Sequence, residues 1–148
     1  MRSVWPFLLS VLLFAPPASQ AQEFYSAPYY CTINPGNTTV TISSYGGSGG
    51  AVVIPETISG YLVTGIGEDA FYFAENVTSV TIPSGVTNIS DGAFLNSTNI
   101  AAINVATNNP AYMSLAGVLF NKTQTRLVAF SEANAASSYT IPDGVVSM

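Results

Sequence analysis

Few residues of this sequence are of the types that carry out chemistry. There is no histidine among its 148 residues, which removes Ser-His-Asp and Cys-His catalysis and most zinc sites. Glu68 and Asp91 form one possible carboxylate pair, since two carboxylates about 5 Å apart would suit a retaining glycosidase. We interpret these two acids instead as solvated residues at equivalent positions of neighbouring repeats. The sequence therefore predicts a non-enzyme with no catalytic residue, cofactor or metal site.

Two other features could suggest reactivity. Cys31 is the only cysteine, so the chain can form no intrachain disulfide and its stability depends on packing. A lone cysteine on a strand is usually a small buried hydrophobe, and this is what we predict for Cys31. The segment Gly46–Gly50 lacks the Gly-Lys-Ser/Thr ending of a phosphate-binding loop. We predict a flexible joint there.

The charge balance excludes two classes of partner. Only 7% of the residues are charged, and the formal net charge is −5. Beyond Arg2, the only cations are Lys122 and Arg126. Binding to nucleic acid and docking to anionic membranes both require clustered Lys and Arg side chains, so we expect neither.

The N-terminus has the features of an export signal, over residues 1–21. Arg2 precedes an apolar run over Val4–Ala15, and Ser19-Gln20-Ala21 places small residues where signal peptidase cleaves. About a dozen apolar residues are too few to span a bilayer, which needs ~20. We therefore predict cleavage after Ala21, a secreted or cell-surface protein, and no membrane insertion after cleavage.

The elements that would position any functional residue follow from an internal repeat of about 23 residues. Three features recur at this same offset: Ala70-Phe71 as Ala93-Phe94, Val63–Ile66 as Val86–Ile89, and Val77–Ile82 as Ile100–Val105. Two further related segments, Thr81–Val86 and Thr140–Val145, are separated by one standard repeat and one enlarged repeat. Met148 aligns with Ile89, in the middle of a unit, so we interpret the last repeat as truncated.

Each unit has the pattern of a short β-strand followed by a second extended segment and a turn. Val77–Ile82 is rich in β-branched residues and predicts a strand, which Pro83 ends because proline cannot donate to a ladder. Val86–Ile89 predicts a second short extended segment. Asp91 then suits the N-cap of a single helical turn that carries Ala93-Phe94 inward. Strands of successive units would stack in parallel and bury one continuous core.

The string from Val77 to Phe94 resembles the BspA-type leucine-rich repeat of bacterial surface proteins, and the resemblance covers residues 51–148. It implies a β-rich solenoid, a leucine-rich-repeat superhelix of ~23-residue repeats with a parallel sheet and short helical turns. It also implies an extracellular interaction module for adhesion. The family often has Cys a few residues after Ala-Phe, whereas this sequence has Ala74 and Ser97 there.

Two hairpins flank or interrupt the predicted array. Within residues 22–50, Tyr30–Ile33 and Thr39–Ile42 surround the turn signal Asn34–Asn37, which predicts an N-terminal capping hairpin over the first strand edge. A second hairpin, an insertion at about residues 110–132, has two apolar runs around a polar five-residue turn. We expect Tyr112 and the strand that begins at Val118 to pack it against the solenoid.

The outward side chains of the repeat strands are the candidate ligand face. They are small and uncharged and lack the aromatic and Arg anchors that concentrate binding energy, so we expect weak contacts multiplied over many repeats. The ligand would be an extracellular protein or glycan. The residues are Thr78, Ser79, Thr81, Ala101, Ala102 and Asn104.

Four other interpretations stay open. The face could be a plain sheet surface, or the repeats could be a spacer or targeting region of a larger secreted enzyme. The open C-terminal strand edge could support edge-to-edge self-association. Five Asn-x-Ser/Thr sequons would carry glycans only in a host that glycosylates them; they are at Asn37, Asn76, Asn88, Asn96 and Asn121.

Overall fold

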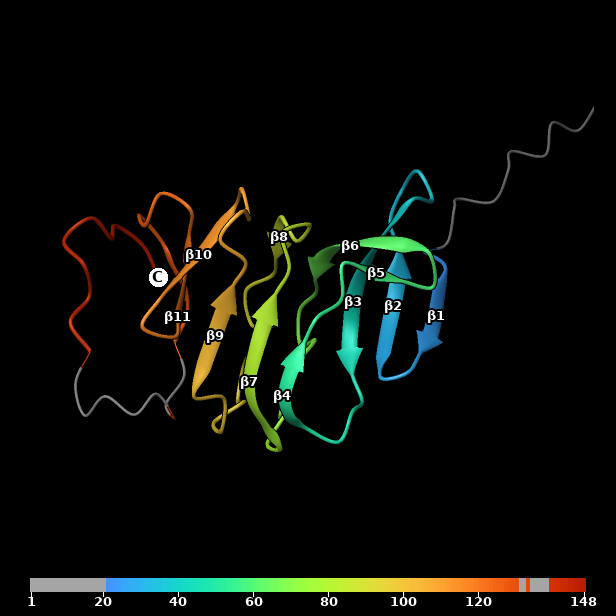
Figure 1. The fold of residues 1–148 in the computed structure, drawn as a ribbon, viewed down its shortest axis with the longest axis horizontal. Coiled ribbons are helices and arrows are strands. Elements are labelled where there is room, and N and C mark those ends of the chain that lie inside the picture. Colours follow the sequence, from blue (N-terminus) through green and yellow to red (C-terminus); the bar gives the residue numbers. More distant parts are fainter. Residues whose placement is uncertain (1–20, 131–132, 134–138) are drawn as a thin grey trace, which may run out of the picture.

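The computed structural model describes residues 21–130, 133 and 139–148. These residues form twelve strands joined by turns, and none of them is in a helix. The predicted signal peptide lies outside the described residues, apart from Ala21. Strands β1, β2, β3, β4, β7 and β9 stand in a row along the long axis, with β1 at one end and β10 and β11 beyond β9 at the other (Figure 1). The strand bounds are β1 (Glu23–Ser26), β2 (Tyr29–Ile33), β3 (Thr39–Tyr45), β4 (Gly50–Val53), β5 (Thr57–Ile58), β6 (Tyr61–Ile66), β7 (Val77–Ile82), β8 (Asn88–Ile89), β9 (Ala102–Val105), β10 (Tyr112–Leu115), β11 (Val118–Asn121) and β12 (Leu127–Ala129).

The sheet that carries the candidate face consists of β4, β7 and β9, whose strands pair in parallel. Val52, Val80 and Ile103 lie at the same level of the three strands, and all are buried. The strand predicted over Val77–Ile82 is confirmed as β7. Because equivalent apolar residues stack at each level, the core continues from one repeat to the next.

A second sheet contains the N-terminal hairpin. β2 and β3 pair antiparallel around the turn predicted at Asn34–Asn37, and β1 adds a third strand. β3 then pairs in parallel with β6, with Val40 opposite Val63, and β6 pairs in parallel with β8. The offset from Val40 to Val63 equals the repeat length. β3 therefore occupies the position of a repeat strand, which the sequence pattern did not reveal.

The turns after β6 and β8 differ from the predicted helical turns. In the second of them, the Ala93 amide donates to the Ser90 carbonyl and the Leu95 amide donates to the Gly92 carbonyl, each three residues back. Gly92 has a φ of 82° and Asn96 a φ of 58°, both in the left-handed region. Left-handed residues at this spacing interrupt a right-handed helix, so the segment forms consecutive tight turns instead.

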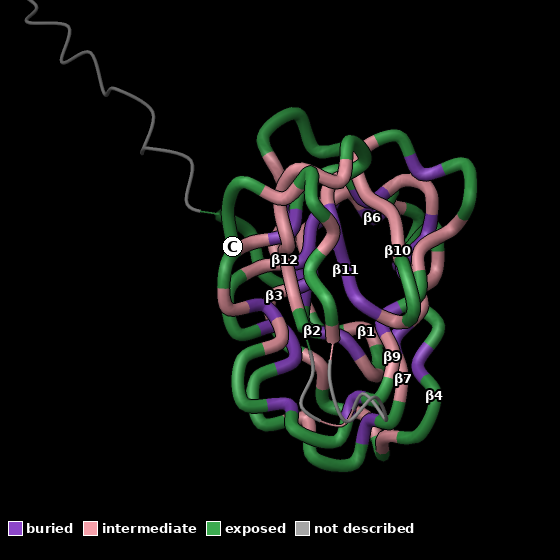
Figure 2. The backbone as a smooth tube through the Cα atoms, turned by 90° about the vertical axis from the view of Figure 1, so that its left-hand side faces the viewer, coloured by how far each residue is buried: buried purple, intermediate pink, exposed green. Residues whose placement is uncertain are grey.

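An aromatic ladder runs along the core beside these turns. The ring centroids of Tyr29, Tyr45, Phe71 and Phe94 follow one another at 5.7, 5.3 and 5.4 Å. Cys31 is fully buried next to this region, as predicted, and burial raises the pKa of its thiol to about 11. In Figure 2 the buried segments of the backbone face the interior of the fold, and the exposed residues lie mostly on its outer turns.

The segment Gly46–Gly50 is packed rather than free. Gly49 has a φ of 95°, and a Cβ there would lie 2.2 Å from the backbone oxygen of Asn76. A Cβ at Gly47 would lie 2.2 Å from the hydroxyl of Tyr45, which would have to move. Close neighbours thus favour glycine at these two positions, whereas the flexibility predicted for the joint stays a prediction.

The insertion is a three-stranded antiparallel sheet of β10, β11 and β12. The predicted hairpin corresponds to β11 and β12, with the polar turn over residues 122–126. Val118, Leu119 and Phe120 of β11 are fully buried, which confirms that this strand packs inward. β10 is an additional strand that the sequence pattern did not indicate. Residues 131–132 of the predicted insertion lie outside the described part of the chain.

Candidate functional site

The parallel pairing of β7 and β9 brings the predicted face residues together. Ser79 lies opposite Ala102, and Thr81 lies opposite Asn104. All four side chains point away from the buried levels and are partly or fully exposed. The two other predicted residues, Thr78 and Ala101, precede Ser79 and Ala102 in the chain. The Ala101 amide donates to the Thr78 carbonyl at 2.8 Å.

The face extends onto β4, which the predicted set of residues did not include. Ala51 pairs with Ser79, and Val53 pairs with Thr81. Val53 is 69% exposed, so it adds an apolar side chain to a row that ends in the Asn104 amide. A signal was present in the sequence, since aligning the first Ile-Pro with the second places Val53 at the level of Thr81.

The insertion closes the other side of this face. The Ile103 amide of β9 donates to the Gly117 carbonyl at 2.9 Å. Gly117 has a φ of 79°, and a Cβ there would lie 3.1 Å from the Cβ of Ala102. A small residue on each side is therefore needed for the turn between β10 and β11 to lie against β9.

Asn109 anchors the insertion to the repeats. This side chain is fully buried, and its amide nitrogen donates to the carbonyls of Pro83 and Val86, each at 2.9 Å. Its amide oxygen accepts from the amides of Ala111 and Tyr112, each at 2.8 Å. All four hydrogen-bonding positions of the side chain are thus used. The sequence pattern did not reveal this role, although Asn-Asn-Pro is a turn signal.

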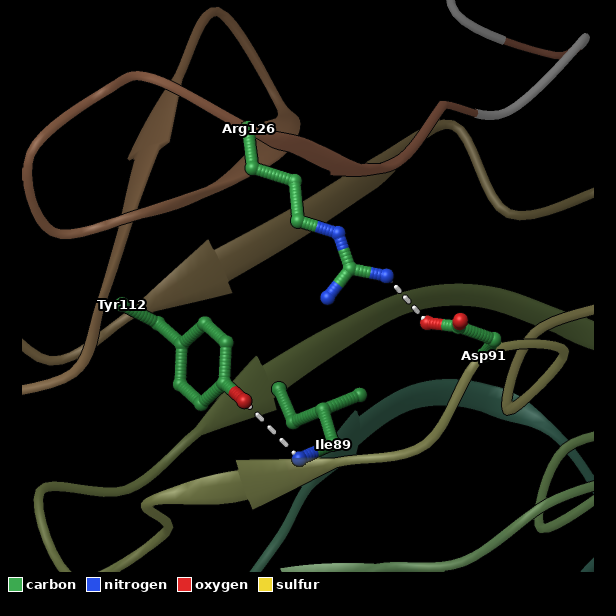
Figure 3. A network of polar contacts seen from close by, with 4 residues as sticks. All are labelled: Ile89, Asp91, Tyr112 and Arg126. Atoms are coloured by element: carbon green, nitrogen blue, oxygen red, sulfur yellow. Dashed lines mark hydrogen bonds and ion pairs between the residues drawn. The ribbon is translucent and has the colours of Figure 1, made fainter. Parts of the chain in front are cut away.

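Two further contacts link the insertion to the second repeat (Figure 3). The Ile89 amide donates to the Tyr112 hydroxyl at 2.9 Å, which confirms the predicted packing of Tyr112. The Arg126 guanidinium pairs with the Asp91 carboxylate. The prediction that Asp91 caps a helical turn is wrong, because no helix forms there and its carboxylate faces Arg126 instead.

The described part of the face is electrically neutral, because its outward residues on β4, β7 and β9 carry no ionisable side chain. Among residues 21–130, 133 and 139–148, no group of three or more potential metal ligands comes together. No helix long and apolar enough to cross a bilayer occurs in that part of the chain. The arrangement offers hydroxyl, amide and methyl groups on the outward side of the strands and no reactive group among the described residues.

The sequence profile of the BspA type leucine-rich repeat region matches residues 50–148 in six copies. The chain belongs to this family. These BspA-type repeats therefore cover the whole candidate face and the insertion. No curated protein matches the chain.

Solved structures of similar proteins agree with the family. One is a leucine-rich cell surface protein from Faecalibacterium prausnitzii, with 31% identity over 62% of this chain and a TM-score of 0.52. Another is the leucine-rich repeat protein of T. pallidum, with 32% identity over 55% of this chain and a TM-score of 0.51. The chain spans only 25% and 38% of these two proteins.

Proposed function

We propose that these BspA-type repeats form an extracellular adhesion module, whose candidate face binds a protein on another cell or in the surrounding matrix. The outward residues of β4, β7 and β9 form the contact surface, and the repeats extend as a solenoid. The export signal predicted over residues 1–21 supports a secreted or cell-surface location. So does the similarity to a protein described as a leucine-rich cell surface protein.

The observation that carries the proposal is the register of the face. Val53, Thr81 and Asn104 lie side by side on successive strands, with no charged group among them. A neutral surface of this kind gives a weak contact per repeat, because it lacks large anchors. Several chains displayed together would bind much more strongly than one, because the later contacts form at high effective concentration.

A binding experiment on beads tests this proposal. The chain from Gln22 onward is immobilised at high density and exposed to a panel of purified host-surface and matrix proteins. We expect retention of at least one protein, and loss of that retention in Thr81→Arg, which places a long cation in the middle of the face. Thr87→Arg is the matched control, since Thr87 is exposed just before β8 and outside the face. Equal retention by both variants, or no retention of any protein, would refute the proposal.

A further inference from the structure

Two exposed aromatic side chains lie outside the candidate face, in the turn after Phe71. Tyr72 is 45% exposed and Phe73 is 55% exposed, and their rings meet edge to face at a centroid distance of 4.6 Å. Phe73 has a φ of 51°, which is strained for a bulky side chain. The equivalent residue of the next repeat is Asn96, a type that tolerates this conformation, with a φ of 58°. Phe73 therefore places an exposed aromatic ring where the next repeat has a residue suited to this backbone conformation.

A small cavity lies beside this aromatic pair. It has a volume of about 200 Å³, and its walls include Tyr45 and the backbones of Gly47 and Gly49. The cavity is smaller than the ~300–1,000 Å³ pockets that hold drug-sized ligands. Its size suits a single ring.

Two polar side chains complete the walls. Glu75 and Asn76 line the cavity, and the structure gives no hydrogen bond to the carboxylate or the side-chain amide among the described residues. A carboxylate accepts hydrogen bonds, whereas an amide both donates and accepts. Hydroxyl groups that point in different directions from one ring would satisfy both groups.

We propose that this cavity binds one neutral hexopyranose of a glycan, with its C–H face against Tyr72 and Phe73 and its hydroxyls toward Glu75 and Asn76. Aromatic rings present a negative face to the slightly positive C–H groups of a sugar. Glu75 and the formal net charge of −5 disfavour acidic sugars, so the ligand is a neutral or N-acetylated hexose.

A second exposed aromatic pair is placed to contact a longer glycan. The rings of Tyr25 and Tyr30 contact each other in a tilted arrangement at a centroid distance of 4.5 Å, and both side chains are about half exposed. The Tyr30 ring lies 3.5 Å from the position of a Cβ on Gly46, the neighbour in sequence of the cavity residue Gly47. A protein partner would not need a ring-sized polar cavity beside an exposed aromatic pair, so the observations favour a glycan.

The proposal can be tested by NMR titration of the chain from Gln22 onward with glucose, galactose, mannose, N-acetylglucosamine and sialic acid. We expect shifts of the Gly47, Gly49 and Asn76 amides with at least one neutral sugar at millimolar concentration, and none with sialic acid. Phe73→Asn copies the residue of the next repeat and relieves the strain, so it should fold at least as well. It should bind the sugar about tenfold more weakly, because one stacking ring is lost.

Leu95→Ala is the matched control, because Leu95 is equally exposed in the equivalent turn but does not line the cavity. This variant should bind the sugar like the unaltered chain. Absence of shifts with every neutral sugar at tens of millimolar, or equal binding by Phe73→Asn, would overturn the proposal. Sugar binding that survives Thr81→Arg would show that the cavity binds sugar independently of the candidate face. Either proposal can therefore fail without the other.

Discussion

Replacing Asn109 with alanine should detach the insertion from the repeats. The substitution removes an amide that donates to Pro83 and Val86 and accepts from two amides at the start of β10. Because Asn109 is fully buried, water cannot easily take its place. Asn108→Ala is the matched control, since this neighbour is the same residue type and is exposed.

The size of the loss follows from the hydrogen bonds. Each intramolecular hydrogen bond contributes about 0.5–1.5 kcal/mol net, and a buried group left unpaired costs about 1–3 kcal/mol. The Pro83 carbonyl keeps a second donor, the Val86 amide at 3.4 Å, so its loss is the smallest of the four. The amides of Ala111 and Tyr112 are half-buried and can be partly rehydrated. We expect the free energy of unfolding to fall by about 3 kcal/mol, and the Tm by about 10 °C or more.

Urea unfolding followed by circular dichroism measures this change in the chain from Gln22 onward. A third variant, Asn109→Asp, keeps both acceptor positions but turns a carboxylate toward two carbonyl oxygens. This geometry raises the pKa of the new carboxyl group, so the stability of the variant should recover as the pH falls and its carboxyl group becomes a donor. If Asn109→Ala costs less than about 1 kcal/mol relative to Asn108→Ala, the insertion is not held by this side chain.

Three further predictions test other parts of the structure. Gly49→Ala should lower the free energy of unfolding by about 3 kcal/mol or more, because its Cβ would overlap the backbone of Asn76. Gly36→Ala, at nearly the same φ but in open space, should lower it by only about 1–2 kcal/mol in the same urea titration. Equal losses in the two variants would contradict the packing argument. Cys31 should react with a thiol reagent at pH 8 far more slowly in the folded chain than in urea, and fast labelling of the folded chain would show that the thiol is accessible. The free energy of unfolding should fall as the pH rises from about 9 toward 11, because the raised thiol pKa makes ionisation costly only in the folded state. Arg126→Ala breaks an exposed ion pair and should cost less than about 1 kcal/mol, with a loss that shrinks in high salt; a larger, salt-independent loss would indicate a packing role for the arginine stem.

The repeat strands could be predicted from the sequence because burial constrains their residue types directly. Val80 and Ile103 occupy the same level of the core, and a polar residue at either position would be unpaired and buried. The outward positions Thr81 and Asn104 follow from the same alternation, which is why they could be assigned to the outer side of the sheet. The repeat period therefore predicts both sides of the sheet.

Features that depend on single backbone angles or on partners distant in sequence were beyond this pattern. The left-handed conformations of Gly92 and Asn96 replaced the expected helical turn, since the apolar residues between them fit either geometry. Asn109 has partners in the preceding repeat, and its type suggests only a local turn. The pairing of Asp91 with Arg126 depends in the same way on how the insertion folds back.

The placement of β3 beside β6 also determines how the length of such a protein can change. The antiparallel strands β1 and β2 occupy one side of β3, so further parallel units can be added only toward the opposite end of the row of strands. Each added unit lengthens the row by one strand spacing, about 4.8 Å, and leaves every contact at the start intact. Gain or loss of whole repeat units thus changes the distance between the two ends of the row of strands in equal steps, without any change in the packing of β1, β2 and β3.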